Sequence, residues 1–209
     1  IQVIYGSPSG LSATFLPDHF VYQDIPDVED GAEEDDSFGS SMAAGDFNGD
    51  GRDDLAIGVP GEGVGVPDIP DAGAVNVIYS SSVGLSATAV STGDGRTDQF
   101  WHQDSPNVEL NADEEDFFGY SLAAGDFNGD GRDDLAIGVP SENISSSVEG
   151  AVNVIYGVAG TTYLNSGLAA KVPLGGSGRA DQYWSQASPD INGGITGSED
   201  WGYSLARGS

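Results

Sequence analysis

A stretch of 13 residues occurs twice in this chain without a single change, and this duplication constrains the fold more than any other feature. The copies occupy 46–58 and 126–138, so they are 80 residues apart. Each begins Asp-Phe-Asn-Gly-Asp-Gly-Arg-Asp-Asp and continues into the apolar run Leu-Ala-Ile-Gly. Self-similarity at a fixed spacing is typical of structural units that pack on one another. The sequence therefore predicts a repeat domain.

The first nine residues of each copy have the oxygen pattern of a loop that wraps a hard cation. Side-chain oxygens stand at positions 1, 3, 5 and 9, and the arginine at position 7 can offer its backbone carbonyl. Calcium takes six to eight oxygen ligands, and the two glycines permit the tight backbone. We predict one calcium ion in each copy, two in the chain. The predicted ligands are Asp46, Asn48, Asp50, Arg52 (backbone O) and Asp54, and then Asp126, Asn128, Asp130, Arg132 (backbone O) and Asp134.

An EF-hand fits the first six positions but fails further on. An EF-hand needs a bidentate Glu at position 12 and flanking helices. Position 12 is Ile57 in one copy and Ile137 in the other, and short apolar runs of strand length flank each loop. A dockerin-type loop fails at the same position. An Asp/Asn/Gly turn without metal is the remaining alternative, since these residues favour turns for their own reasons.

The repeat extends beyond the loop and predicts an all-β fold. Four short strands are expected in the first unit, near 39–45, 55–59, 74–79 and 98–103, with turn signals between them. Four strands in a unit of some tens of residues are typical of a β-propeller blade. The expected fold is a set of four-stranded antiparallel blades, two of them complete, with partial blades at both ends.

The order of these motifs resembles the FG-GAP repeat. The Phe-Gly element, the aspartate loop and a Gly-Val-Pro element follow one another in each unit. The resemblance implies the N-terminal propeller of integrin α-subunits, or of secreted bacterial proteins, with calcium bound by the loop aspartates. The matching dipeptides and tripeptides are Phe38-Gly39, Phe118-Gly119, the variant Trp201-Gly202, Gly58-Val59-Pro60 and Gly138-Val139-Pro140.

The repeat boundaries divide a single repeat domain over 1–206. The spacing exceeds that of an ordinary blade, so insertions are expected within 81–116 and 157–199. The last three residues interrupt the repeat pattern and are interpreted as a vector-derived tail. The predicted parts are a partial blade at 1–35, blades at 36–115 and 116–198, the first strand of a further blade at 199–206, and the tail at 207–209.

Charge and composition limit the kinds of partner and the cellular location that the chain can have. The net charge is −28, from 34 acidic and 6 basic residues. Nucleic acid is an unsuitable partner because no basic patch exists to displace counterions from phosphate. No apolar segment is long enough for membrane insertion, and cysteine is absent. Calcium is abundant outside cells, so an extracellular or cell-surface location is expected.

The expected function is a non-catalytic, calcium-binding module for adhesion or for binding an extracellular protein or glycan. The alternatives are an accessory propeller domain of a secreted carbohydrate-active or other hydrolase, and a purely structural scaffold. Two blades are too few to close a propeller, and open sheet edges pair with other chains. We therefore expect either a ring-closing homo-oligomer or the remaining blades of a parent protein as partners.

The search for catalytic residues favours structural roles. The sequence has no Gly-x-Ser-x-Gly elbow and no cysteine nucleophile. The tryptophans could stack on sugars, but their alignment with Val21 favours packing between blades. The glutamates before each Phe-Gly element favour solvated surface or accessory calcium contact over glycosidase chemistry. The residues concerned are His19, His102, Trp101, Trp184, Glu33, Glu34, Glu114 and Glu115.

Overall fold

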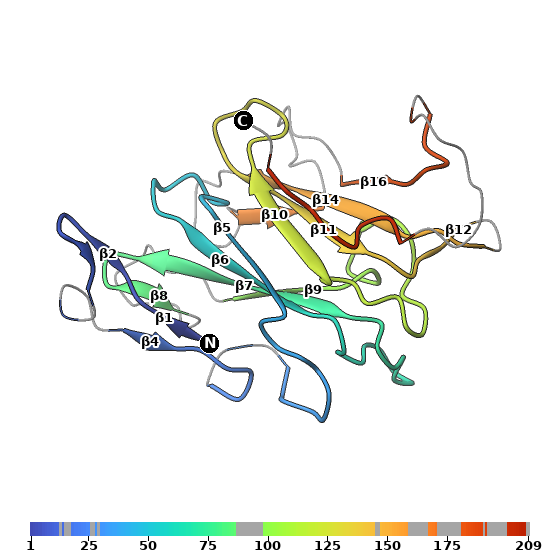
Figure 1. Cartoon of the computed structure of the whole chain (residues 1–209), viewed down its shortest axis with the longest axis horizontal. Coiled ribbons are helices and arrows are strands. Elements are labelled where there is room, and N and C mark those ends of the chain that lie inside the picture. Colours follow the sequence, from blue (N-terminus) through green and yellow to red (C-terminus); the bar gives the residue numbers. More distant parts are fainter. Residues whose placement is uncertain are drawn as a thin grey trace.

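Two antiparallel sheets of the same construction dominate a computed structural model of the chain (Figure 1). Within the described residues no helix occurs, and hence no helix long and apolar enough to cross a membrane. The all-β prediction is confirmed. The structure describes residues 1–12, 14, 18–25, 28, 30–86, 98–144, 147–158, 167–170, 181–189, 191 and 200–207.

The first sheet is a propeller blade whose strands follow one another in space as they do in sequence. The order runs from β5 through β6 and β7 to β8, with β9 also paired to β7. Its third strand is buried along its whole length, which its nearly continuous apolar sequence explains. The strands are β5 (Ser41–Gly45), β6 (Asp54–Val59), β7 (Ala74–Ser81), β8 (Gly84–Ser86) and β9 (Gln99–Trp101).

The outer strand of this blade consists of two pieces, and this accounts for the long repeat. Strand β8 pairs with the end of β7, with Tyr79 opposite Ser86. Strand β9 pairs with the beginning of β7, with Val77 opposite Gln99. Both pieces lie along one edge of β7, so the chain leaves the outer strand after β8 and rejoins it at β9. The sequence predicted the second piece, near 98–103, and the break between the two pieces lies within the segment where an insertion was expected.

The second sheet repeats this arrangement. Strand β14 pairs with β11 on one side and with both β15 and β16 on the other, so its outer strand is divided as well. A two-stranded hairpin of β12 and β13 follows β11. The strands are β10 (Ser121–Gly125), β11 (Asp134–Val139), β12 (Asn143–Ile144), β13 (Ser147–Val148), β14 (Ala151–Val158), β15 (Gly167–Ala169) and β16 (Gln182–Trp184).

The N-terminal residues have the form of the outer half of a blade. Val3 pairs with His19 as Val77 pairs with Gln99 in the first complete blade. At the other end, Trp201 forms one parallel bridge with Gly150, and residues 200–207 form no strand. The N-terminal strands are β1 (Gln2–Val3), β2 (Gly6–Ser7), β3 (Gly10–Leu11) and β4 (His19–Phe20).

The blades meet through their first strands, where β5 packs beside β10. They share one apolar core, in which Phe47, Tyr79, Phe118 and Leu135 are almost completely buried. Figure 1 shows the cyan and green sheet lying alongside the yellow and orange one. Burial of apolar surface between the sheets provides the main stabilisation of this contact.

Hydrogen bonds at repeat spacing set how one blade sits on the next. The Ser41 hydroxyl donates to the Gly119 carbonyl (2.6 Å), and the Ser121 hydroxyl donates to the Gly202 carbonyl in the same way (2.6 Å). The Phe-Gly element of one blade therefore binds the first strand of the blade before it.

Tyrosines of the third strand form a second repeated contact. The Tyr5 hydroxyl accepts the Leu85 N–H (2.8 Å), and the Tyr79 hydroxyl accepts the Leu168 N–H (3.1 Å). Tyr79 lies in β7 and Tyr5 follows β1 at the equivalent repeat position, so each bond joins one blade to the outer strand of the next. The Val-Ile-Tyr repetition in the sequence is thus a contact between blades.

The glycine of the Gly-Val-Pro element is required by this packing. A Cβ atom on Gly58 would lie 2.1 Å from the Gly119 carbonyl oxygen, and one on Gly138 would lie 1.9 Å from the Gly202 carbonyl oxygen. Both distances are far below van der Waals contact, and both neighbours are backbone atoms that cannot rotate away. Glycine is therefore the residue that lets the blades approach.

We predict that Gly58→Ala lowers the free energy of unfolding by about 1–3 kcal/mol, because the added methyl group forces the blades apart. Chemical denaturation measures the change. The matched control is Gly6→Ala, which has open space around its added Cβ atom and should change the stability by less than about 0.5 kcal/mol. Equal effects of the two substitutions would contradict the packing role.

Candidate metal centre

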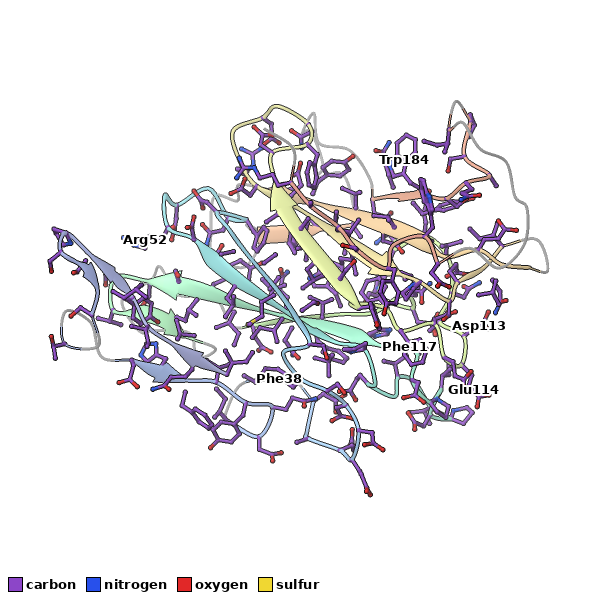
Figure 2. All side chains as sticks on the ribbon, in the orientation of Figure 1. Phe38, Arg52, Asp113, Glu114, Phe117 and Trp184 are labelled. Carbon is purple, nitrogen blue, oxygen red and sulfur yellow. The ribbon has the colours of Figure 1, made fainter. Side chains whose placement is uncertain are left out.

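The duplicated loops connect the first and second strands of each blade and lie at the same end of the two sheets. The first loop follows β5 and the second follows β10. Figure 2 shows Arg52 at the tip of the first loop, while Asp113 and Glu114 lie toward the opposite end of the molecule. The acidic segments that precede the Phe-Gly elements are therefore remote from the loops.

The aspartate at position 1 organises each loop by accepting backbone N–H groups. Asp46 accepts hydrogen bonds from Asp50 (2.9 Å) and Gly51 (2.8 Å). Asp126 accepts the corresponding bonds, and the Gly131 N–H in particular holds the pKa of Asp126 below its usual range. Both side chains are thus turned toward the inside of the loop backbone.

The aspartate at position 5 pairs with the arginine at position 7. Asp50 Oδ2 lies 3.0 Å from Arg52 Nη1, and Asp130 Oδ2 lies 2.6 Å from Arg132 Nη2. These pairs are exposed to solvent, so each contributes little to stability. Their effect is to hold the arginine side chain back over the loop.

The aspartate at position 9 is the buried member of each set. Asp54 and Asp134 are 1% and 0% exposed. Asp54 accepts the Phe47 N–H (3.2 Å) and the Ser80 N–H (2.8 Å), so its carboxylate joins the loop to the third strand. Burial raises the pKa of Asp54 to about 8 and that of Asp134 to about 6.

The composition of the loops fits a bound calcium ion. Every predicted donor is an oxygen atom, which suits a hard cation. The Asn128 side-chain oxygen is buried and has no hydrogen-bond partner, and buried polar atoms are rarely left in that state. The loop carboxylates do not themselves form a tight group. Among the described residues, the single set of three acidic side chains with oxygens within 4.8 Å of one another is Asp30, Glu33 and Glu62.

The aspartate at position 8 has a role that sequence reasoning did not assign. Asp133 accepts the Asp46 N–H through its carboxylate (3.0 Å) and donates its own N–H to the Asp46 carbonyl (3.2 Å). The second blade therefore holds position 1 of the loop in the first blade. Its equivalent in the first loop, Asp53, is exposed.

The tryptophans and histidines considered in the sequence analysis have different environments in the structure. Trp101 is 9% exposed and belongs to the shared core, as predicted, whereas Trp184 is 37% exposed, so the packing prediction is wrong for Trp184 in this chain. The His19 ring bonds to the Tyr5 hydroxyl (2.6 Å). His102 is partly buried, and this lowers its pKa.

Comparison with known proteins identifies the repeat. The FG-GAP repeat family model matches residues 38–78 and 118–155, and this confirms the resemblance read from the motifs. Phosphatidylinositol-glycan-specific phospholipase D of Bos taurus is 31% identical over 164 residues, which are 78% of this chain and 17% of that protein. Integrin alpha-PS2 of Drosophila melanogaster is 36% identical over 121 residues, 57% of this chain and 7% of its own length.

A third relative, integrin alpha-5 of Xenopus laevis, is 28% identical over 145 residues, 66% of this chain and 11% of that protein. The chain therefore spans only a small part of the curated relatives it matches.

The buried aspartates predict an unusual pH dependence. Their folded pKa values lie above the ordinary value of 3.8, so the folded state holds extra protons and stability falls as pH rises from about 4 to about 8. In chelator, the melting temperature should be lower at pH 8 than at pH 5. Asp54→Asn should lessen the fall between pH 6 and pH 8, and saturating calcium should lessen it too. A melting temperature that rises with pH in chelator would contradict this assignment.

The contact of Asp133 with the neighbouring loop gives a paired test. Asp133→Ala should destabilise the protein by about 1–2 kcal/mol, because the Asp46 N–H loses its acceptor. It should also weaken calcium binding by the first loop roughly 10-fold, as loss of supporting contacts does at other metal sites. Calorimetric titration measures the affinity. Asp53→Ala is the control and should have little effect; equal losses in both variants would rule out the contact between blades.

Proposed function

From two FG-GAP repeats of integrin-like type, we propose that this chain is a calcium-binding, non-catalytic propeller segment that binds an extracellular protein or glycan. Each loop is proposed to hold one calcium ion through positions 1, 3, 5 and 9 and the position 7 carbonyl. The observation that best supports metal binding is the burial of the aspartate at position 9. A carboxylate with no basic partner in a buried site is costly as an anion, and a cation at the loop offsets that cost.

Calcium in this arrangement would act as a structural staple. Asp54 connects the loop to Ser80 on the third strand, and Asp134 connects the second loop to Gly157. An ion held by such a carboxylate would fix the first, second and third strands of the blade relative to one another. The ligand-binding surface would then be formed by loops on a rigid scaffold, which is where binding residues are concentrated in proteins.

The second candidate is an accessory propeller domain of a hydrolase. Its support is the 31% identity to a phospholipase D whose own chain is about six times longer than the matched part. In this case the propeller would position a separate catalytic domain. In either case the open sheet edges would be covered by further blades, from the same polypeptide or from other copies. Light scattering in calcium distinguishes a closed oligomer from a monomer.

Calcium should raise the melting temperature, because ligand that binds only the folded state stabilises it by about 2.7 kcal/mol per site at 100 times its dissociation constant. Chelator should reverse the effect. The double variant Asp50→Asn/Asp130→Asn should lose most of it, whereas Asp53→Asn, in the same loop but outside the proposed ligands, should keep it. An unchanged melting temperature on chelation would show that the loops are turns without metal.

The ligand class needs a separate measurement. Immobilised glycans and extracellular matrix proteins, probed with the calcium-loaded chain, should identify saturable binding that chelator abolishes. The parallel control is the double loop variant. Binding that persists unchanged in chelator would separate ligand recognition from the metal and contradict the proposed role of calcium.

A further inference from the structure

A second acidic cluster lies at the end of the first blade opposite its duplicated loop. Asp30, Glu33 and Glu62 each contribute an oxygen atom, and these oxygens lie within 4.8 Å of one another. Glu62 follows the end of β6, while the loop follows the end of β5, and these two strands are antiparallel. The length of the sheet therefore separates the cluster from the loop.

Glu62 distinguishes this cluster from an ordinary acidic surface patch, because it is buried. Its side chain is 0% exposed. Gln23 donates to Oε2 (2.8 Å), but Oε1 is buried and accepts no hydrogen bond. The two ion pairs found among the described residues both lie in the duplicated loops. His102 lines the cavity beside the cluster, but burial lowers its pKa. A fully buried carboxylate that forms no ion pair and lies beside two further acidic groups is strongly unfavourable as an anion.

The backbone around the cluster is held in place by further acidic residues. The buried Asp36 accepts the Glu33 N–H (2.5 Å), and Asp24 accepts the Ala32 N–H (3.2 Å). The Gly61 N–H donates to the Asp36 carbonyl (3.1 Å), and this bond fixes the acidic segment against the turn that carries Glu62. The exposed carboxylates of Asp30 and Glu33 are thus presented to a buried one by an ordered backbone.

Two members of the cluster, Asp30 and Glu33, line a cavity of about 560 Å³ with room for water and additional ligands, and Gly61 and Gly63 on either side of Glu62 line it as well. Gly63 admits Asp68 to this cavity, since a Cβ atom on Gly63 would lie 2.5 Å from Asp68 Oδ1. The cavity lining also includes Asp35 and Asp71. Its walls therefore supply oxygen atoms and negative charge on several sides.

We propose that Asp30, Glu33 and Glu62 bind a hard divalent cation, calcium in an extracellular setting, at a site separate from the duplicated loops. The donor set is composed of oxygen atoms, which hard cations prefer over nitrogen and sulfur ligands. Calcium accepts irregular geometry and bound water, so two exposed carboxylates and a buried one beside an open cavity suit it better than they suit magnesium. The cation supplies the positive charge that the buried Glu62 lacks.

The second blade provides a natural comparison. At the equivalent positions it has Leu110, Asp113 and Glu142, so one carboxylate is replaced by an apolar side chain. Glu142 is also buried and also accepts a hydrogen bond from a glutamine, Gln103. These residues do not form a three-carboxylate group. The proposal therefore predicts one such site in the chain and not two.

Counting bound calcium tests the site directly. Equilibrium dialysis of the full chain, followed by metal analysis, should find three ions: one for each duplicated loop and one for the cluster. The variant Asp30→Asn/Glu33→Gln changes two exposed side chains and should lose one ion, with an unchanged melting temperature in chelator. The matched control, Asp113→Asn/Glu114→Gln, neutralises two carboxylates in the equivalent segment of the second blade (Figure 2) and should keep all three.

The loop variant Asp50→Asn/Asp130→Asn separates this site from the proposed function. This variant should lose the two loop ions and keep the cluster ion. If the proposed function is wrong and the loops bind no calcium, the wild-type chain should still bind one ion, and the Asp30/Glu33 variant should lose it. Glu62→Gln should lose the cluster ion without a lower melting temperature in chelator. Wild-type ion counts in both the Asp30/Glu33 and Glu62 variants, or an equal loss in the second-blade control, would overturn the proposal.

Discussion

The architecture depends on a contact between backbones, where the Phe-Gly element of one blade enters the blade before it. The Gly119 carbonyl occupies the space that a side chain on Gly58 would need, and the Ser41 hydroxyl binds that same carbonyl. Apolar burial favours association of the two sheets in many orientations. The close approach selects one of them, and its repetition at Gly138 and Gly202 gives the blades a constant relationship.

The first of the duplicated loops shares in this arrangement, because it is held in place across the blade boundary. Asp133 of the second blade holds the backbone of Asp46 in the first, while Asp54 binds its own loop and the third strand. Blade packing and loop geometry are therefore coupled. An ion that orders a loop would stabilise the contact between blades, and a defect in that contact would loosen the loop.

Much of this organisation was predictable from local patterns. The short apolar runs gave the strands, and the glycine, aspartate and phenylalanine spacing identified the repeat. The Asp133 contact was not predictable, because it needs the orientation of one blade on another. The burial of Glu62 was also hidden, since its sequence context, between glycines, reads as an exposed turn. Trp184 was misjudged because its alignment with Trp101 implied equal packing, whereas their surroundings in this chain differ.

The division of the outer strand has a consequence for how such chains can diversify. Strands β8 and β9 both pair with the continuous strand β7, Ser86 with Tyr79 and Gln99 with Val77. The register of β7 is set by its pairing with β6. It therefore does not depend on how many residues lie between β8 and β9. Closing a longer loop adds only a small entropic cost. Residues can therefore be gained, lost or exchanged at this point while every blade keeps its register, which makes it a natural place to graft a foreign peptide.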